Sequence, residues 1–221
     1  MTNAPTVLRG LLLLLLTPSA AFAQTGSPAP RDPVWQLTPY LGVARNSPAG
    51  NFLGLTPDRN HLFLGVHITA TVARSGRWSL AYAPEVVPLL LLSDTPTYHL
   101  DGTTDEGLQK YVVDGQSNVA GFGLSPVGFE LRLRAGAGWR LYASTAAGFL
   151  KFTRNTPVPE ARAFNYSFEY GGGVEVQVRP DWWLRIGYKF HHFSNGYSAA
   201  ANPGVDGHVW LVGIGRAFGR R

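Results

Sequence analysis

The sequence predicts an all-β protein, an eight-stranded antiparallel transmembrane β-barrel with short periplasmic turns and long extracellular loops. Apolar and polar residues alternate with a period of two in eight segments, which is typical of strands whose two faces meet different surroundings. Short and long connections alternate between these segments, as they do in outer-membrane barrels. Tryptophans gather beside the short connections, where an aromatic girdle at the membrane surface would lie.

The first predicted strand shows the alternation on which the prediction depends. Trp35, Leu37 and Leu41 share one face of that strand, whereas Gln36 and Thr38 share the other. The fifth strand alternates less regularly than the others. Eight strands are enough to close a barrel whose interior is filled by side chains. In chain order, the predicted strands cover residues 35–44, 62–73, 77–90, 127–134, 139–152, 164–178, 182–194 and 208–218.

The connections favour a membrane barrel over a soluble one. Alternation alone also fits a soluble barrel, in which the apolar face would point inward. The connections after the second, fourth and sixth strands are short, whereas the other four are long, and this is the outer-membrane pattern. The short ones are 74–76, 135–138 and 179–181; the long ones are 46–60, 93–126, 154–163 and 195–207; the tryptophans near the short ones are Trp35, Trp78, Trp139, Trp182 and Trp183.

The first 23 residues have the pattern of a secretory signal peptide. Arg9 supplies the positive charge, residues 11–16 are an apolar run, and Ala21 and Ala23 form a small-x-small cleavage site. An N-terminal anchor is the alternative, but the apolar run is too short to span a bilayer as a helix. The predicted organisation is a signal peptide at 1–23, an N-terminal lead-in at 24–34 and a barrel at 35–221.

The composition argues against several classes of function. The chain has no cysteine, so it has neither disulfides nor thiolate metal sites. The net charge of +5 is not concentrated in a run, and nucleic acid is therefore not an expected partner. The six histidines show no metal-ligand spacing. We expect neither a metal nor another cofactor.

The polar face of the strands carries charges of both signs. If that face lines the lumen, the charges need partners there, because an unpaired buried charge is costly. His191 would also face the lumen. The residues predicted to form this paired network are Glu85, Glu130, Glu169, Glu175, Arg132, Arg134, Arg185 and Lys189.

His192 and Ser194 are a candidate base and nucleophile. Residues at i and i+2 of a strand share a face, so the imidazole could reach the hydroxyl and activate it. Asp206 returns on the next strand, where its carboxylate could orient the imidazole. The alternative is a strand end with polar residues that lead into a loop, since His-x-Ser is frequent by chance. All three residues continue the apolar, lipid-facing row. With periplasmic termini they would lie near the outer leaflet.

Three segments of this chain resemble the lipid A 3-O-deacylases of the PagL type, also described as acyloxyacyl hydrolases of the outer membrane. The resemblance covers most of the chain after residue 23, and its diagnostic residues lie in the last quarter. Asp206 stands where characterised members of the family carry Glu. The matching segments are HFSN at 192–195, NPGVD at 202–206 and GLSPVG at 123–128.

The resemblance implies a Ser–His–acid esterase in the outer membrane of a Gram-negative bacterium. Ser194 would be the nucleophile, His192 the base and Asp206 the acid, while Asn202 would belong to the oxyanion hole and Asn195 to the same pocket. The alternative for both asparagines is a role in the turn of the loop. The substrate would be lipid A of lipopolysaccharide, which would lose its 3-position acyl chain, and the barrel would contact outer-membrane lipid. A homodimer is compatible with this family. The alternative function is a non-catalytic barrel, namely a structural or adhesive surface protein or an inactive homologue.

Overall fold

The computed structural model describes residues 34–48, 53–107 and 109–219. The predicted signal peptide at 1–23 and all of the lead-in except its last residue lie outside these ranges. No helix in the described ranges is long and apolar enough to cross a membrane. They contain nine strands: β1 (Trp35–Ala44), β2 (Asn60–Ser75), β3 (Trp78–Tyr82), β4 (Glu85–Thr103), β5 (Gln109–Gly136), β6 (Trp139–Phe152), β7 (Phe164–Arg179), β8 (Trp182–Ser194) and β9 (Val205–Phe218).

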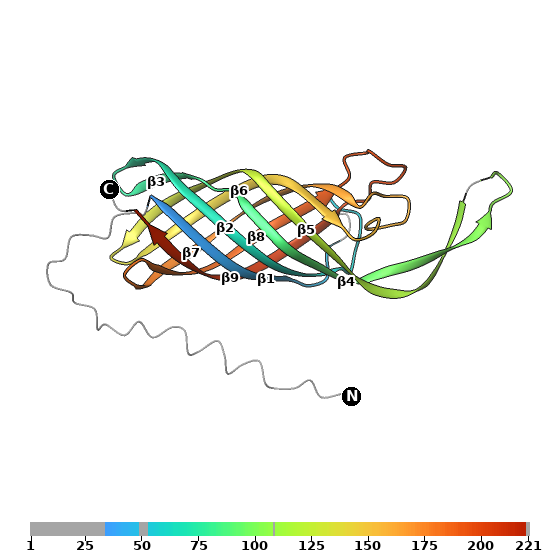
Figure 1. Cartoon of the computed structure of the whole chain (residues 1–221), viewed down its shortest axis with the longest axis horizontal. Coiled ribbons are helices and arrows are strands. Elements are labelled where there is room, and N and C mark those ends of the chain that lie inside the picture. The colour runs from blue at the N-terminus through green and yellow to red at the C-terminus, as the bar shows by residue number, and fades with distance from the viewer. Residues whose placement is uncertain (1–33, 49–52, 108, 220–221) are drawn as a thin grey trace, which may run out of the picture.

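The strands form one closed antiparallel barrel (Figure 1). Apart from β3 and β4, strands that follow one another in the chain pair with each other, and β1 closes the ring by pairing with β9 on one side and β2 on the other. β3 and β4 share one position in the wall, because both pair with β2 and both pair with β5. The nine strands therefore occupy the eight positions that the sequence predicts.

A proline separates β3 from β4. Pro84 has no N–H to donate to a ladder, and the interruption falls at Ala83 and Pro84, within the predicted strand 77–90. The wall stays closed there because the Ala83 N–H donates to the Gly128 carbonyl at 2.8 Å, and the Ile68 N–H donates to the Pro84 carbonyl at 3.0 Å. The prediction of one unbroken strand was therefore wrong at this point.

The predicted loop at 93–126 is mostly a hairpin of two strands. β4 continues to Thr103 and β5 begins at Gln109, so this hairpin projects beyond the rest of the barrel (Figure 1). Residues 112–118 are exposed one after another. A strand with water on both sides has no buried face, so it has no reason to alternate. The absence of alternation explains why the sequence pattern indicated a loop.

The outer surface of the barrel carries the apolar row of every strand. Leu131 on β5, Ile186 on β8 and Val212 on β9 are each between 44% and 48% exposed, although all are aliphatic. Trp35, Trp78, Trp139 and Trp182 are also exposed and lie at the end with the short turns, hereafter the turn end. Trp183, which was predicted to join them, is instead buried, with its ring 4.1 Å from the guanidinium of Arg140. Its odd position in β8 points it inward.

Buried ion pairs fill the lumen towards the turn end. Glu130 contacts Arg132 at 2.5 Å and Arg185 at 2.7 Å. Glu175 contacts Arg185 at 3.0 Å and Arg140 at 2.6 Å. The predicted network is confirmed for these glutamates and for Arg132 and Arg185. Arg140 was not predicted.

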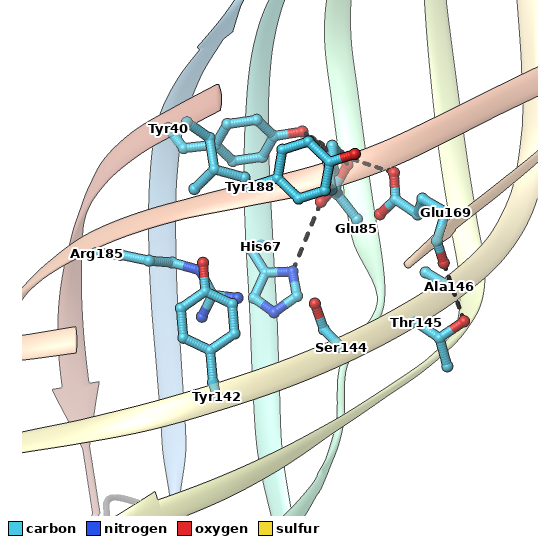
Figure 2. A pocket seen from close by; sticks show the side chains of 12 residues that line it. Tyr40, His67, Glu85, Tyr142, Ser144, Thr145, Ala146, Glu169, Arg185 and Tyr188 are labelled. Atoms are coloured by element: carbon cyan, nitrogen blue, oxygen red, sulfur yellow. Dashed lines mark hydrogen bonds and ion pairs between the residues drawn. The ribbon is translucent and has the colours of Figure 1, made fainter. Parts of the chain in front are cut away.

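A second group of charges lies beside a small cavity in the lumen (Figure 2). Lys189 contacts Glu85 and Glu169 at 2.7 Å each, and the Tyr40 hydroxyl donates to Glu85 at 2.7 Å. The cavity has a volume of about 20 Å³, which is close to the room that one water needs. Arg134, which was also predicted to be lumenal, is partly exposed near the turn end.

The lumen is apolar towards the end with the long loops, hereafter the loop end. Phe63, Leu92, Phe152 and Phe193 are at most 2% exposed and belong to one hydrophobic cluster. The predicted inward direction of His191 is confirmed, since its ring is buried 5.0 Å from that of Phe63. Side chains therefore pack the inside of the barrel behind the wall that carries His192 and Ser194.

A charge placed in the outward apolar row of a strand, hereafter the belt, tests whether this row faces lipid. Ile186→Arg should lower the free energy of unfolding by about 2–4 kcal/mol, because the guanidinium would face hydrocarbon between Val174 and Val212. Unfolding in urea from lipid vesicles, followed by tryptophan fluorescence, measures the change. Val113→Arg on the projecting hairpin is the control and should change stability by less than about 0.5 kcal/mol. Equal effects of the two changes would argue against the belt.

Candidate active site

The candidate base and acid face each other across two neighbouring strands at the loop end. β8 and β9 are antiparallel, and their register makes His192 and Asp206 direct Cα partners. Opposite residues of an antiparallel pair bring their side chains to the same face and close together. His192 Nδ1 lies 2.7 Å from Asp206 Oδ1. The pairing that the sequence pattern predicts for these two residues is therefore present.

The hydrogen bond to Asp206 determines which imidazole nitrogen is available. A carboxylate accepts the proton of Nδ1, so Nε2 of the neutral ring is left with its lone pair and can take up a proton. His192 keeps 13% of its side chain exposed, whereas Asp206 is fully buried. The acid is thus shielded from solvent while the base stays reachable from outside.

Ser194 lies on the same face of β8 as His192. It is the last residue of the strand, and its partner on β7 is Tyr166, while the partner of His192 is Phe168. Both aromatic residues are exposed on the outer surface. The candidate nucleophile is therefore bordered by lipid-facing rings rather than by the lumen.

Phe193 anchors the strand end between the two candidate residues. It points in the opposite direction, into the hydrophobic cluster, and is fully buried with its ring centroid 5.0 Å from that of Phe152. Because successive side chains of a strand alternate, this packing fixes His192 and Ser194 on the outside. A rigid strand is a precise platform for a catalytic pair.

Gly204 lies against both members of the pair. Its φ of 61° belongs to the left-handed region, where glycine has no steric penalty. A Cβ at this position would come within 2.9 Å of His192 Cε1 and 3.5 Å of Ser194 Cβ. Gly204 belongs to the NPGVD segment, but the sequence pattern alone does not indicate this packing role.

Asn195 and Asn202 form hydrogen bonds that stabilise the β8–β9 loop. The Asn195 backbone N–H donates to Asn202 Oδ1 at 2.8 Å, and Asn195 Nδ2 donates to the Ala201 carbonyl at 2.6 Å. Asn195 is buried, so its side chain shapes the loop from within. Since Oδ1 of Asn202 accepts from the backbone, its Nδ2 is the group that remains to donate elsewhere.

Residues from the β1–β2 loop complete the surroundings of the acid. The Leu53 N–H donates to Asp206 Oδ2 at 3.1 Å, and Gly54 packs against the carboxylate. No sequence signal marked either residue, because the contact is made by a backbone group from a distant loop. Neither here nor in the rest of the described ranges could a group of three or more His, Asp or Glu side chains hold a metal ion.

Comparison with known proteins places the chain in a family. The family model described as lipid A 3-O-deacylase (PagL) matches residues 76–214, more than half of the chain, and the match includes His192, Ser194 and Asp206. The chain belongs to this lipid A 3-O-deacylase (PagL) family. No curated protein matches the chain in sequence.

Among the solved structures that share the fold are an outer membrane enzyme and a bacterial surface protein. The crystal structure of the outer membrane enzyme PagL is 12% identical with a TM-score of 0.54, and the match covers 80% of this chain and 97% of that one. Neisserial surface protein A is 10% identical with a TM-score of 0.51, and the match covers 87% of this chain and 100% of that one. The predicted outer-membrane β-barrel is thereby confirmed, and the location is the outer membrane of a Gram-negative bacterium.

Proposed function

We propose that this protein is a serine esterase that removes the 3-position ester-linked acyl chain from lipid A of lipopolysaccharide. The observation that carries the proposal is the 2.7 Å contact between His192 and Asp206, made beside Ser194 on the outer surface of the barrel. A hydroxyl, an imidazole and a carboxylate in this order are the parts of a nucleophilic hydrolase.

In the first step, Ser194 Oγ attacks the ester carbonyl. The proton of its hydroxyl passes to Nε2 of His192, and Asp206 stabilises the imidazolium that forms. The carbonyl oxygen becomes an oxyanion, for which Nδ2 of Asn202 is the proposed donor. When the tetrahedral intermediate collapses, the sugar oxygen leaves with the proton from His192, and the acyl chain stays on Ser194.

In the second step, water releases the fatty acid. His192 takes a proton from the water, which attacks the acyl-Ser194 carbonyl, and the proton then returns to Ser194 Oγ as the ester breaks. The lipid-facing position suits this substrate, because the acyl chain can stay beside Phe168 and Tyr166 throughout. Its apolar surface then never has to enter water, which would be unfavourable.

The shorter acid is compatible with this mechanism. Asp has one methylene less than the Glu of characterised members, but the register places His192 and Asp206 directly opposite each other. The carboxylate therefore reaches Nδ1 without the additional length. The resulting contact favours an active enzyme over a non-catalytic barrel.

Product analysis tests the proposed reaction. The chain without residues 1–23 is refolded in detergent, its folding is checked by gel mobility before and after boiling, and it is incubated with lipopolysaccharides of several acylation patterns. Mass spectrometry of lipid A should show the loss of one 3-hydroxy acyl chain, and the boiled protein should leave the lipid unchanged. If the folded protein removes no acyl chain from any of these lipids, the non-catalytic barrel is the better explanation.

Replacement of the acid should be milder than replacement of the nucleophile or base. Asp206→Ala should lower kcat, but its loss should be about 10²-fold smaller than the loss in Ser194→Ala. The acid orients and stabilises the imidazole but does not itself react. Initial rates of fatty acid release measure both variants. Asp206→Glu, which restores the usual acid, should remain within about tenfold of wild type. An Asp206→Ala variant as active as wild type would exclude the acid from the mechanism.

A further inference from the structure

Residues 53–56 of the β1–β2 loop form a short strap across the candidate active site. Three backbone N–H groups of this strap donate hydrogen bonds to the β8–β9 side. The Leu53 N–H donates to Asp206 Oδ2 at 3.1 Å, the Leu55 N–H to the Pro203 carbonyl at 2.6 Å, and the Thr56 N–H to the Gly204 carbonyl at 3.3 Å. The strap therefore contacts both the acid and the segment that packs against His192 and Ser194.

The strap and the acid are in close contact at Gly54. A Cβ at this residue would lie 2.7 Å from the Asp206 nitrogen and 2.9 Å from Asp206 Cγ. Real Cβ atoms do not approach that closely, so only glycine allows the strap to lie at this distance from the carboxylate. Asp206 is fully buried as a result, although it belongs to the outward row of β9.

We propose that the strap is a positioning device for the catalytic acid. This inference rests on the function proposed above, in which Asp206 supports His192. The two oxygens of the carboxylate have separate partners: Oδ1 accepts from His192, and Oδ2 accepts from the Leu53 N–H. Two fixed partners hold a carboxylate in one orientation, whereas an acid with a single partner can rotate away from the imidazole.

The strap also excludes water from the Asp206 carboxylate and stabilises its negative charge. A carboxylate without water needs hydrogen bonds from the protein to stay charged, and a backbone amide supplies one here without adding a charge. The ion pair between Asp206 and protonated His192 is stronger away from water. The strap thus stabilises the imidazolium through the acid and does not itself touch the ester.

Two variants weaken the strap in different ways. Leu53→Pro removes the N–H that donates to Oδ2, and Gly54→Ala pushes the strap away from the carboxylate. Each should lower kcat about 10- to 100-fold, the effect of losing one hydrogen bond to a charged group, with little change in KM. Leu53→Ala keeps the N–H and should be more active than Leu53→Pro. Gly115→Ala on the projecting hairpin is the control and should match wild type. Gel mobility confirms that each variant is folded.

The decisive measurement repeats the strap variants in the Asp206→Ala background. A device that acts through the acid has nothing left to position there, so Leu53→Pro and Gly54→Ala should each change the residual rate less than about twofold. Equal losses in both backgrounds would overturn the proposal, because the strap would then serve the order of the loops in general.

The remaining outcomes separate this proposal from the function itself. If Ser194→Ala, His192→Ala and Asp206→Ala lower activity while the folded strap variants match wild type, the positioning role is wrong and the esterase stands. If the folded wild-type protein has no activity on any lipopolysaccharide, both the esterase and the positioning role are rejected.

Discussion

Ser194→Ala should abolish fatty acid release, with a loss of about 10⁴- to 10⁶-fold in kcat. Without Oγ there is no nucleophile to form the acyl-enzyme, and the residual rate depends on oxyanion stabilisation and substrate binding alone. The measurement is the initial rate of acyl chain loss from lipopolysaccharide by mass spectrometry. Binding of the lipid should persist, because the flanking Phe168 and Tyr166 are unchanged.

His192→Ala should cost about as much as Ser194→Ala, and the double variant should cost little more than either. The two residues act in one step, since the hydroxyl attacks only as its proton leaves to Nε2, so their effects are not additive. Ser198→Ala is the matched control, because Ser198 lies in the same β8–β9 loop and is exposed. It should retain wild-type activity.

Retained activity of Ser194→Ala would contradict the mechanism in a specific way. The chain would still be a hydrolase, but another group would attack the ester. The Asp206→Ala variant would then show whether His192 acts on water directly, because the same imidazole and acid could serve as a general base. A variant whose gel mobility is the same before and after boiling is misfolded. Its loss of activity says nothing about the mechanism, so only variants that keep the mobility difference are compared.

The direction in which each strand side chain points could be predicted from the sequence, because lipid and lumen select different residues for the two faces. One side of each strand meets lipid and the other meets the packed lumen, so the period of two gives the direction of His192, Phe193 and Ser194. The same alternation indicates that Glu130 and Glu175 point inward. The odd position of Trp183 in β8 gives its inward direction, although its nearness to a short turn suggests a place in the aromatic girdle.

Contacts between loops could not be predicted in this way. The strap reaches Asp206 from 153 residues away in sequence through a backbone N–H, and neither the loop path nor a backbone donor leaves a residue-type signal. The projecting hairpin could not be predicted either, because its strands have solvent on both faces and their residues therefore do not alternate. The acid was recognisable as a residue, but what holds it in place was visible only in the fold.

Glu130→Gln should lower the free energy of unfolding by about 3–5 kcal/mol, the largest stability loss that we expect from one isosteric change. Glu130 is fully buried and contacts Arg132, Arg185 and His67. The amide keeps the shape of the carboxylate but removes its charge, so two buried guanidinium groups lose a counter-ion. Urea unfolding from lipid vesicles, followed by tryptophan fluorescence, measures the difference.

An exposed ion pair of the same chain provides the control for that loss. Lys110 and Asp101 lie 2.9 Å apart on the projecting hairpin, and both side chains are about half exposed. Lys110→Ala should cost less than about 1 kcal/mol, because water solvates the remaining charge. If Glu130→Gln lowers the free energy of unfolding no more than Lys110→Ala does, water must reach the lumenal arginines, and a dry ion-pair network at the turn end would be refuted. A loss several times larger would show that the ion pairs at the turn end form a dry core, which stabilises the barrel whose wall carries His192 and Ser194.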